Sequence, residues 1–195
     1  LGAVGGIMIA STAGALTVGT ADDDGILTAG GAPNTAGSMT LTNNSADNDL
    51  TINSTIANNG TGVVSLTQAG VGELVLNGTN TYTGTTTINA GTLTATGTAA
   101  LGATTGALAV NNTNAGAGTD VVVNLSTDAP TTKGSLSGTI ATASSGTNTV
   151  TINNGGQLFT INQTTAGTYA GVIEGGGGFT LGSLSTAKLT LTGEN

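Results

Sequence analysis

The sequence predicts an all-β protein and, within that class, a parallel β-helix, also called a β-solenoid. Three observations predict it: apolar and polar residues alternate along short runs, turn-forming residues separate the runs, and some runs recur. Strong helix formers are sparse, and no apolar stripe with helical spacing persists. The pattern therefore argues against a helical fold.

The alternating runs follow one another along most of the chain. Each places apolar residues on one face and Thr, Ser or Asn on the other, as half-buried strands do. Clusters of Gly, Asn, Asp and Thr, such as residues 58–62 and 153–157, supply the positive φ angles of tight turns. In chain order the apolar positions are Met39, Leu41, Leu50, Ile52, Val64, Leu66, Leu74, Leu76, Ile88, Leu93, Leu108, Val110, Val121, Val123, Leu125, Val150, Ile152, Phe179, Leu181, Leu189 and Leu191.

Internal similarity favours a solenoid over a sandwich, which fits the strand spacing equally well. GELVLNG, which begins at Gly72, is echoed by AKLTLTGEN, which begins at Ala187. Recurrent strand phrases indicate recurrent coils of about 20 to 30 residues, so we expect about seven to nine coils. The rule for parallel crossover connections predicts a right-handed helix. We expect an N-terminal strand or cap region over residues 1–37 and solenoid repeats over 38–195.

The charge pattern limits the classes of partner. The net charge is −8, with ten acidic residues, no His and no Cys. Lys133 and Lys188 are the only bases, so the chain has almost nothing with which to neutralise phosphate, and we expect neither nucleic acid nor membrane insertion. The absence of Cys excludes disulfides and thiolate metal sites. An acidic, Cys-free chain rich in Thr, Asn and Gly is typical of exported bacterial proteins, which predicts an extracellular or cell-surface location.

The segment Leu1–Ala10 is apolar and rich in glycine, and it has two interpretations. It is either the first strand of the solenoid or the remnant of a cleaved signal. It is too short for a spanning helix, which needs roughly 18 apolar residues, and no positive charge precedes it.

Residues 72–102 are the most specific part of the sequence. They resemble the passenger-associated transport repeat of autotransporter proteins, also called the autotransporter-associated β-strand repeat. The chief departure is Thr85, where a second glycine is common. The residues that carry the resemblance are Leu74, Leu76, Gly78, Asn80, Thr81, Tyr82, Gly84, Thr86, Thr87, Ile88, Asn89, Gly91, Thr92, Leu93, Ala100, Leu101 and Gly102.

The resemblance implies an exported multi-repeat passenger, displayed as a β-helix. Residues 167–195 look like the run that leads into a further repeat, so we expect the chain to be part of a longer protein. The expected partners are neighbouring copies of the chain or the rest of that longer chain, with a host or glycan surface as a further alternative.

Candidate chemistry is scarce. With no His or Cys, a Ser-His or Cys-His nucleophile is excluded. Paired carboxylates of the glycosidase type remain as an alternative, but Glu73, Glu174 and Glu194 lie in repeat-like phrases. We predict no catalytic, cofactor-binding or metal-ligating residue, and no enzyme.

Three further features have a structural and a functional interpretation. The run Asp22–Asp24 before Gly25 could hold calcium, but it lacks the ligand spacing of known calcium loops, which favours an exposed turn. Gly175–Gly178 has neither the Lys nor the helix of a phosphate loop and predicts a wide turn. Tyr82 is either a ligand-facing aromatic or, as its place in the repeat favours, a corner-packing residue.

The sequence therefore predicts a non-enzymatic structural and presenting segment of a surface-displayed or secreted protein, of adhesin type. The first alternative is a self-assembling filament subunit that uses strand addition or coil stacking between subunits. The second is a polysaccharide-active β-helix enzyme.

Overall fold

The computed structural model describes residues 2–96, 99–116, 118–126 and 128–195, and these residues form β-strands and no α-helix. The strands pair in parallel throughout the sheets. The predicted all-β class and the parallel solenoid are both confirmed. Within the described ranges, no helix has the length and hydropathy needed to cross a membrane.

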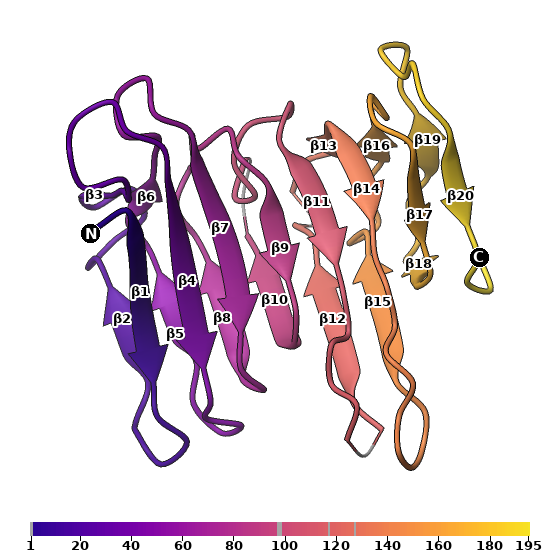
Figure 1. Cartoon of the computed structure of the whole chain (residues 1–195), viewed down its shortest axis with the longest axis horizontal. Helices are drawn as coiled ribbons and strands as arrows, with labels where there is room; N and C mark the ends of the chain where they lie inside the picture. The colour runs from indigo at the N-terminus through magenta and orange to yellow at the C-terminus, as the bar shows by residue number, and fades with distance from the viewer. Residues whose placement is uncertain (1, 97–98, 117, 127) are drawn as a thin grey trace.

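The strands lie on three sides of an elongated body (Figure 1). The first sheet contains β1 (Val4–Ile9), β4 (Gly37–Asn43), β7 (Val64–Ala69), β9 (Thr86–Ile88), β11 (Ala107–Val110) and β14 (Ser135–Ser137), and β17 (Gly167–Tyr169) and β20 (Leu189–Leu191) continue this side. The second sheet contains β2 (Leu16–Val18), β5 (Leu50–Ile52), β8 (Glu73–Leu76), β10 (Gly91–Ala95), β12 (Asp120–Asn124), β15 (Thr149–Asn153) and β18 (Val172–Glu174). The third side contains β3 (Ile26–Leu27), β6 (Thr55–Ile56), β13 (Thr131–Lys133), β16 (Phe159–Ile161) and β19 (Phe179–Leu181).

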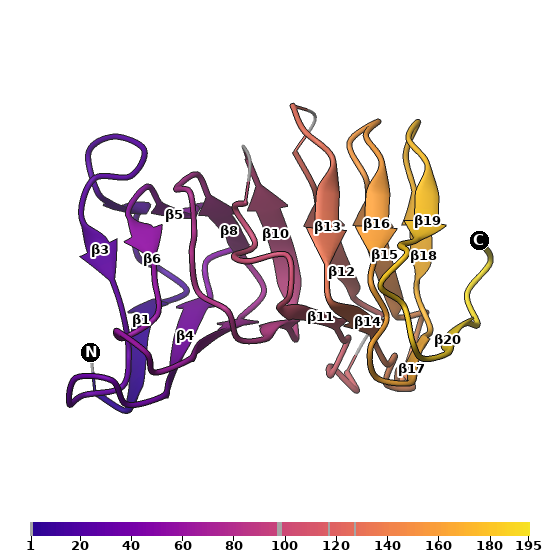
Figure 2. The same ribbon diagram turned by 90° about the horizontal axis from the view of Figure 1, so that it is seen from above.

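The chain runs along the first sheet, the second sheet and the third side in turn, and one full circuit of the three sides is one coil. In the described part of the chain, seven coils end at β19 and β20 begins the next, within the predicted range. Coil length varies more than predicted: Leu66 pairs with Thr86, 20 residues away, whereas Val4 pairs with Ser38, 34 residues away. The first sheet runs downward in front and the second upward behind as the chain advances, which makes the helix right-handed (Figures 1 and 2).

The core consists of side chains stacked from coil to coil. One column of the second sheet joins all seven strands and contains Leu16, Leu50, Leu74, Leu93, Val123, Ile152 and Ile173. Its five middle members are buried, whereas Leu16 at one end is exposed and Ile173 at the other is partly buried. The predicted apolar positions from Met39 to Ile152 are buried, which confirms the alternation. Leu181 in the last coil is 49% exposed, because no further coil lies over it in this structure.

The apolar N-terminal segment is the first strand of the solenoid. β1 pairs with β4 over six residues, from Val4 with Ser38 to Ile9 with Asn43. Its side chains alternate, with Ile9 buried and Met8 exposed. The first of the two interpretations of Leu1–Ala10 is therefore correct for the residues described; Leu1 itself lies outside them.

The third side is interrupted midway along the body. β3 pairs with β6, and β13 pairs with β16, but the two passes between them, near Asn80–Tyr82 and at residues 99–104, form no strand. Backbone pairing across this part is sparse, so side chains must satisfy its carbonyl and amide groups. The candidate site lies at this interruption.

Candidate functional site

Asn80 links three successive coils at the interruption. Its side chain is buried, its Oδ1 accepts a hydrogen bond from the Ile56 backbone N–H at 2.6 Å, and its Nδ2 donates to the Ala100 carbonyl at 2.6 Å. The Asn80 side chain therefore takes the place of backbone hydrogen bonds to the coil before it and to the coil after it. Buried Asn43 and Asn112 bridge coils in a similar way, with Nδ2 bonds to the Glu73 and Thr149 carbonyls.

Tyr82 fills the corner next to Asn80. It is fully buried, and its hydroxyl lies 2.7 Å from Thr86 Oγ1, which donates to the Leu101 carbonyl at 3.3 Å. Because the Thr86 proton points to Leu101, the Tyr82 hydroxyl donates to Thr86. Burial raises the pKa of Tyr82 well above its usual value. The corner-packing interpretation is confirmed, since the ring has no exposed surface to offer a ligand.

Gly102 shows why the repeat ends in glycine. Its φ is +74°, and a Cβ atom built there would lie 2.8 Å from Cζ of Tyr82. Any side chain would strain the backbone and collide with the buried ring. Tyr82 and Gly102 are therefore one packing unit, although 20 residues separate them.

Comparison with known protein families finds a match for this part of the chain. Residues 66–95, from within β7 to the end of β10, match the family described as the passenger-associated-transport-repeat. The chain carries a passenger-associated transport repeat. The match overlaps the segment predicted from sequence, and this repeat family is one of secreted, surface-exposed autotransporter passengers. It covers 30 of 195 residues, and neither a curated protein nor a solved structure matches the chain significantly.

The passenger-associated transport repeat is joined in register to the coils on both sides. β8 pairs with β5 before it, and β10 pairs with β12 after it. The inward column of the second sheet runs through both strands of the repeat without a break, at Leu74 and Leu93. The matched residues thus belong to two successive coils of a continuous solenoid.

Asp22–Asp24 lie in an exposed turn between β2 and β3, as predicted. The carboxylates of Asp23 and Asp24 accept hydrogen bonds from the protein itself. The Thr79 backbone N–H lowers the pKa of Asp23, and the Thr20 hydroxyl, which donates to Asp24 Oδ2 at 2.6 Å, lowers the pKa of Asp24. These bonds give both acidic side chains a structural role. Gly175–Gly178 form the predicted wide turn, between β18 and β19.

The structure separates Glu73 from the other two candidate catalytic carboxylates. Glu73 and Glu174 lie on the second sheet with β10, β12 and β15 between them, about 19 Å apart at the usual strand spacing. Glu194 lies at the Glu174 end, because Asn195 Oδ1 accepts a hydrogen bond from the Ile173 backbone N–H. Glu73 Oε1 accepts a hydrogen bond from Thr94.

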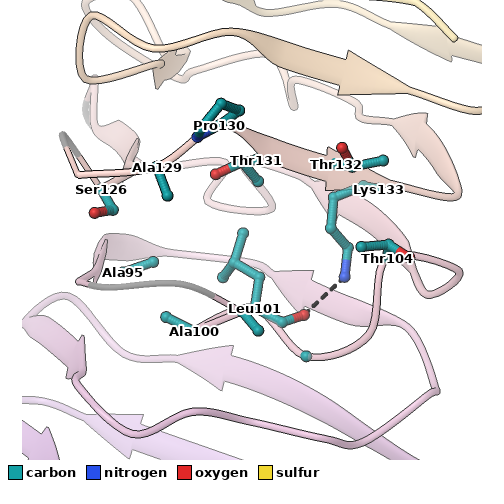
Figure 3. Close-up of a pocket in the computed structure, with 12 residues that line it drawn as sticks. Ala95, Ala100, Leu101, Thr104, Ser126, Ala129, Pro130, Thr131, Thr132 and Lys133 are labelled. Atoms are coloured by element: carbon teal, nitrogen blue, oxygen red, sulfur yellow. Dashed lines mark hydrogen bonds between the residues drawn. The ribbon is translucent and has the colours of Figure 1, made fainter.

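Lys133 is the functional candidate that sequence reasoning missed. It takes an inward position on β13, in register with Ile161 and buried. Its Nζ donates to the Leu101 carbonyl at 2.7 Å (Figure 3). The same Nζ donates to the Ala103 carbonyl at 3.0 Å. Burial lowers the pKa of Lys133 to about 8. A lysine between Thr132 and Gly134 has no apolar neighbour to indicate burial; its only sequence signal is its alignment with the FTI phrase of the next coil.

A small cavity of about 100 Å³ lies beside Lys133 on the interrupted third side (Figure 3). Ala95, residues 99–102 and Thr104 of the fourth coil form one wall, and Ser126 and residues 129–133 of the fifth form the other. The cavity is the place where the two coils lose backbone pairing.

Proposed function

We propose that the chain is a non-enzymatic presenting segment of a longer, adhesin-like passenger on a bacterial surface. The observation that carries the proposal is the passenger-associated transport repeat built in register into a continuous solenoid. Each coil of a solenoid needs only its neighbours for stability, so coils can be added to make a long stack. Such a stack extends a surface away from the cell.

The outer surface of the first sheet supports a presenting role. One outward column contains Thr40, Thr67, Thr87, Ala109 and Ser137, all small and uncharged. Such a surface offers hydroxyl groups to a host or glycan surface and contains no titratable group for catalysis. The distance between Glu73 and Glu174 also speaks against a glycosidase pair made from these two residues.

Export and display test the proposal directly. The full chain, placed between a signal peptide and a translocating outer-membrane barrel, is expected to reach the surface of a Gram-negative cell. Added protease and an antibody against the chain would measure its exposure on intact cells, with the barrel alone as a control for leakage. Retention of the folded chain in the periplasm would contradict the proposal.

The filament hypothesis makes a different prediction. β1 and the last coil are open edges in this structure, and Val4 and Met8 are 78% and 69% exposed. Electron microscopy of the purified chain over a concentration series separates the two hypotheses. The presenting segment gives isolated short rods at every concentration, whereas a filament subunit gives ordered fibres that lengthen with concentration.

A further inference from the structure

The ammonium group of Lys133 is a buried cation without a counter-ion. Its two hydrogen-bond partners are backbone carbonyls, and among the described residues no carboxylate forms a salt bridge with it. An ammonium group has three N–H donors, so one remains after these two bonds. Buried charges in proteins are almost always paired, because an isolated charge loses its hydration without compensation.

The two carbonyls do not depend on Lys133. The Leu101 carbonyl also accepts a hydrogen bond from Thr86 Oγ1, and the Ala103 carbonyl accepts one from the Gly106 backbone N–H at 3.1 Å. Satisfying this backbone is therefore not a sufficient reason for a lysine at this position. The position suits an amine that has a further partner.

The cavity that Lys133 lines is mostly apolar. Its walls include Ala95, Ala99, Ala100, Leu101, Ala129 and Pro130, and Lys133 lies at one end (Figure 3). Thr104 and Pro130 are exposed, which opens the cavity to solvent. A volume of about 100 Å³ equals the liquid volume of about three water molecules. It fits a ligand of a few heavy atoms with one charged end and one apolar end.

We propose that this cavity binds a short aliphatic monocarboxylate of the size of acetate or propionate. The carboxylate accepts a hydrogen bond from the Lys133 ammonium, and the methyl or ethyl group contacts the alanine wall. The pair neutralises the buried charge, and the short chain removes apolar surface from water. Phosphate or sulfate fits less well, since a dianion would place several oxygens against an apolar wall with a single cation.

The lysine content makes a direct test simple. The sequence contains two lysines, so protein labelled with ¹³C at lysine Cε gives two NMR signals. Lys188 is exposed and serves as the internal reference. The pH midpoint of each signal is measured in sodium propionate and in sodium chloride of equal ionic strength, with propionamide added to a third sample as the uncharged analogue.

The proposal predicts that propionate raises the Lys133 midpoint by about one pH unit or more, because a carboxylate favours the charged amine. The effect saturates with propionate concentration, Lys188 does not respond, and propionamide has no effect. Equal Lys133 midpoints in propionate and chloride would overturn the proposal.

Two variants locate the site. Ala129→Leu fills the cavity and leaves Lys133 in place, so it is expected to abolish the propionate effect on Lys133. Lys188→Met changes the other cation and is expected to leave the effect unchanged. If Ala129→Leu folds and keeps the full effect, propionate binds elsewhere and the cavity assignment is wrong.

Discussion

Tyr82→Ala is expected to lower the free energy of unfolding by about 3–5 kcal/mol, the range for removing a buried aromatic side chain. The ring fills the corner of the repeat, contacts Gly102 and is fully buried, so the substitution leaves a cavity between coils. Urea unfolding followed by far-UV circular dichroism measures the change. Neighbouring coils support one another, so we expect the whole transition to move to lower urea concentration.

Tyr82→Phe is the matched control. It keeps the ring and removes only the hydroxyl that donates to Thr86, so the expected loss is about 1 kcal/mol. If Tyr82→Ala and Tyr82→Phe cost the same, the ring would not be the packing element of the corner, and our account of the repeat would be wrong.

Lys133→Met is expected to stabilise the chain at pH 7, by up to about 3 kcal/mol. Burial holds the pKa of Lys133 at about 8, against 10.5 without the protein environment. The folded state therefore disfavours the charged amine. Methionine has a similar shape and no charge, and both carbonyl partners keep another donor.

The same pKa difference predicts how stability depends on pH. Below pH 8 the Lys133 amine is protonated in both the folded and the unfolded state, and the folded state bears the full cost of the buried charge. Between about pH 8 and 10 the folded state loses the proton first, so the stability of the natural chain rises with pH. Above pH 10 the raised pKa values of Tyr82 and Tyr169 act in the opposite direction, because their unfolded forms ionise first.

Chemical unfolding at several pH values from 7 to 10 checks this prediction. Lys133→Met is expected to remove the rise, whereas Lys188→Met, at an exposed position, is expected to keep it. A natural chain whose stability is flat over this range, or a Lys133→Met variant that keeps the rise, would show that the Lys133 amine is not buried as a cation.

The fold could be predicted because its signals are local. Alternation places Leu50 and Ile52 on one face whatever lies above them, and recurrent phrases indicate stacking. The corner bridges could not be predicted in this way. Asn80 lies in a turn-like phrase, and only its position between Ile56 and Ala100, residues distant in sequence, shows that it replaces backbone pairing.

The candidate site was beyond sequence reasoning for a related reason. A lone lysine predicts a solvent-exposed side chain, since charged residues are rarely buried. Lys133 is buried because β13 aligns with β16, which puts it in the column of Ile161. Tyr82 was predicted correctly because its role belongs to a recognisable repeat. The place of a residue in a sequence motif can be read from the sequence. Its place in a column of stacked side chains requires the pairing register of the strands, which the structure gives.

Disulfide trapping tests the central claim, that the coils stack in the register described. The natural chain contains no cysteine, so introduced pairs are unambiguous. Thr67 and Thr87 are partners on adjacent strands of the first sheet, about 4.8 Å apart, within the range for a disulfide. Thr67→Cys with Thr87→Cys is expected to cross-link on mild oxidation. Thr40→Cys with Thr87→Cys, two strands apart, is expected to remain reduced. The opposite result, a bond in the second pair and free thiols in the first, would contradict the stacked solenoid.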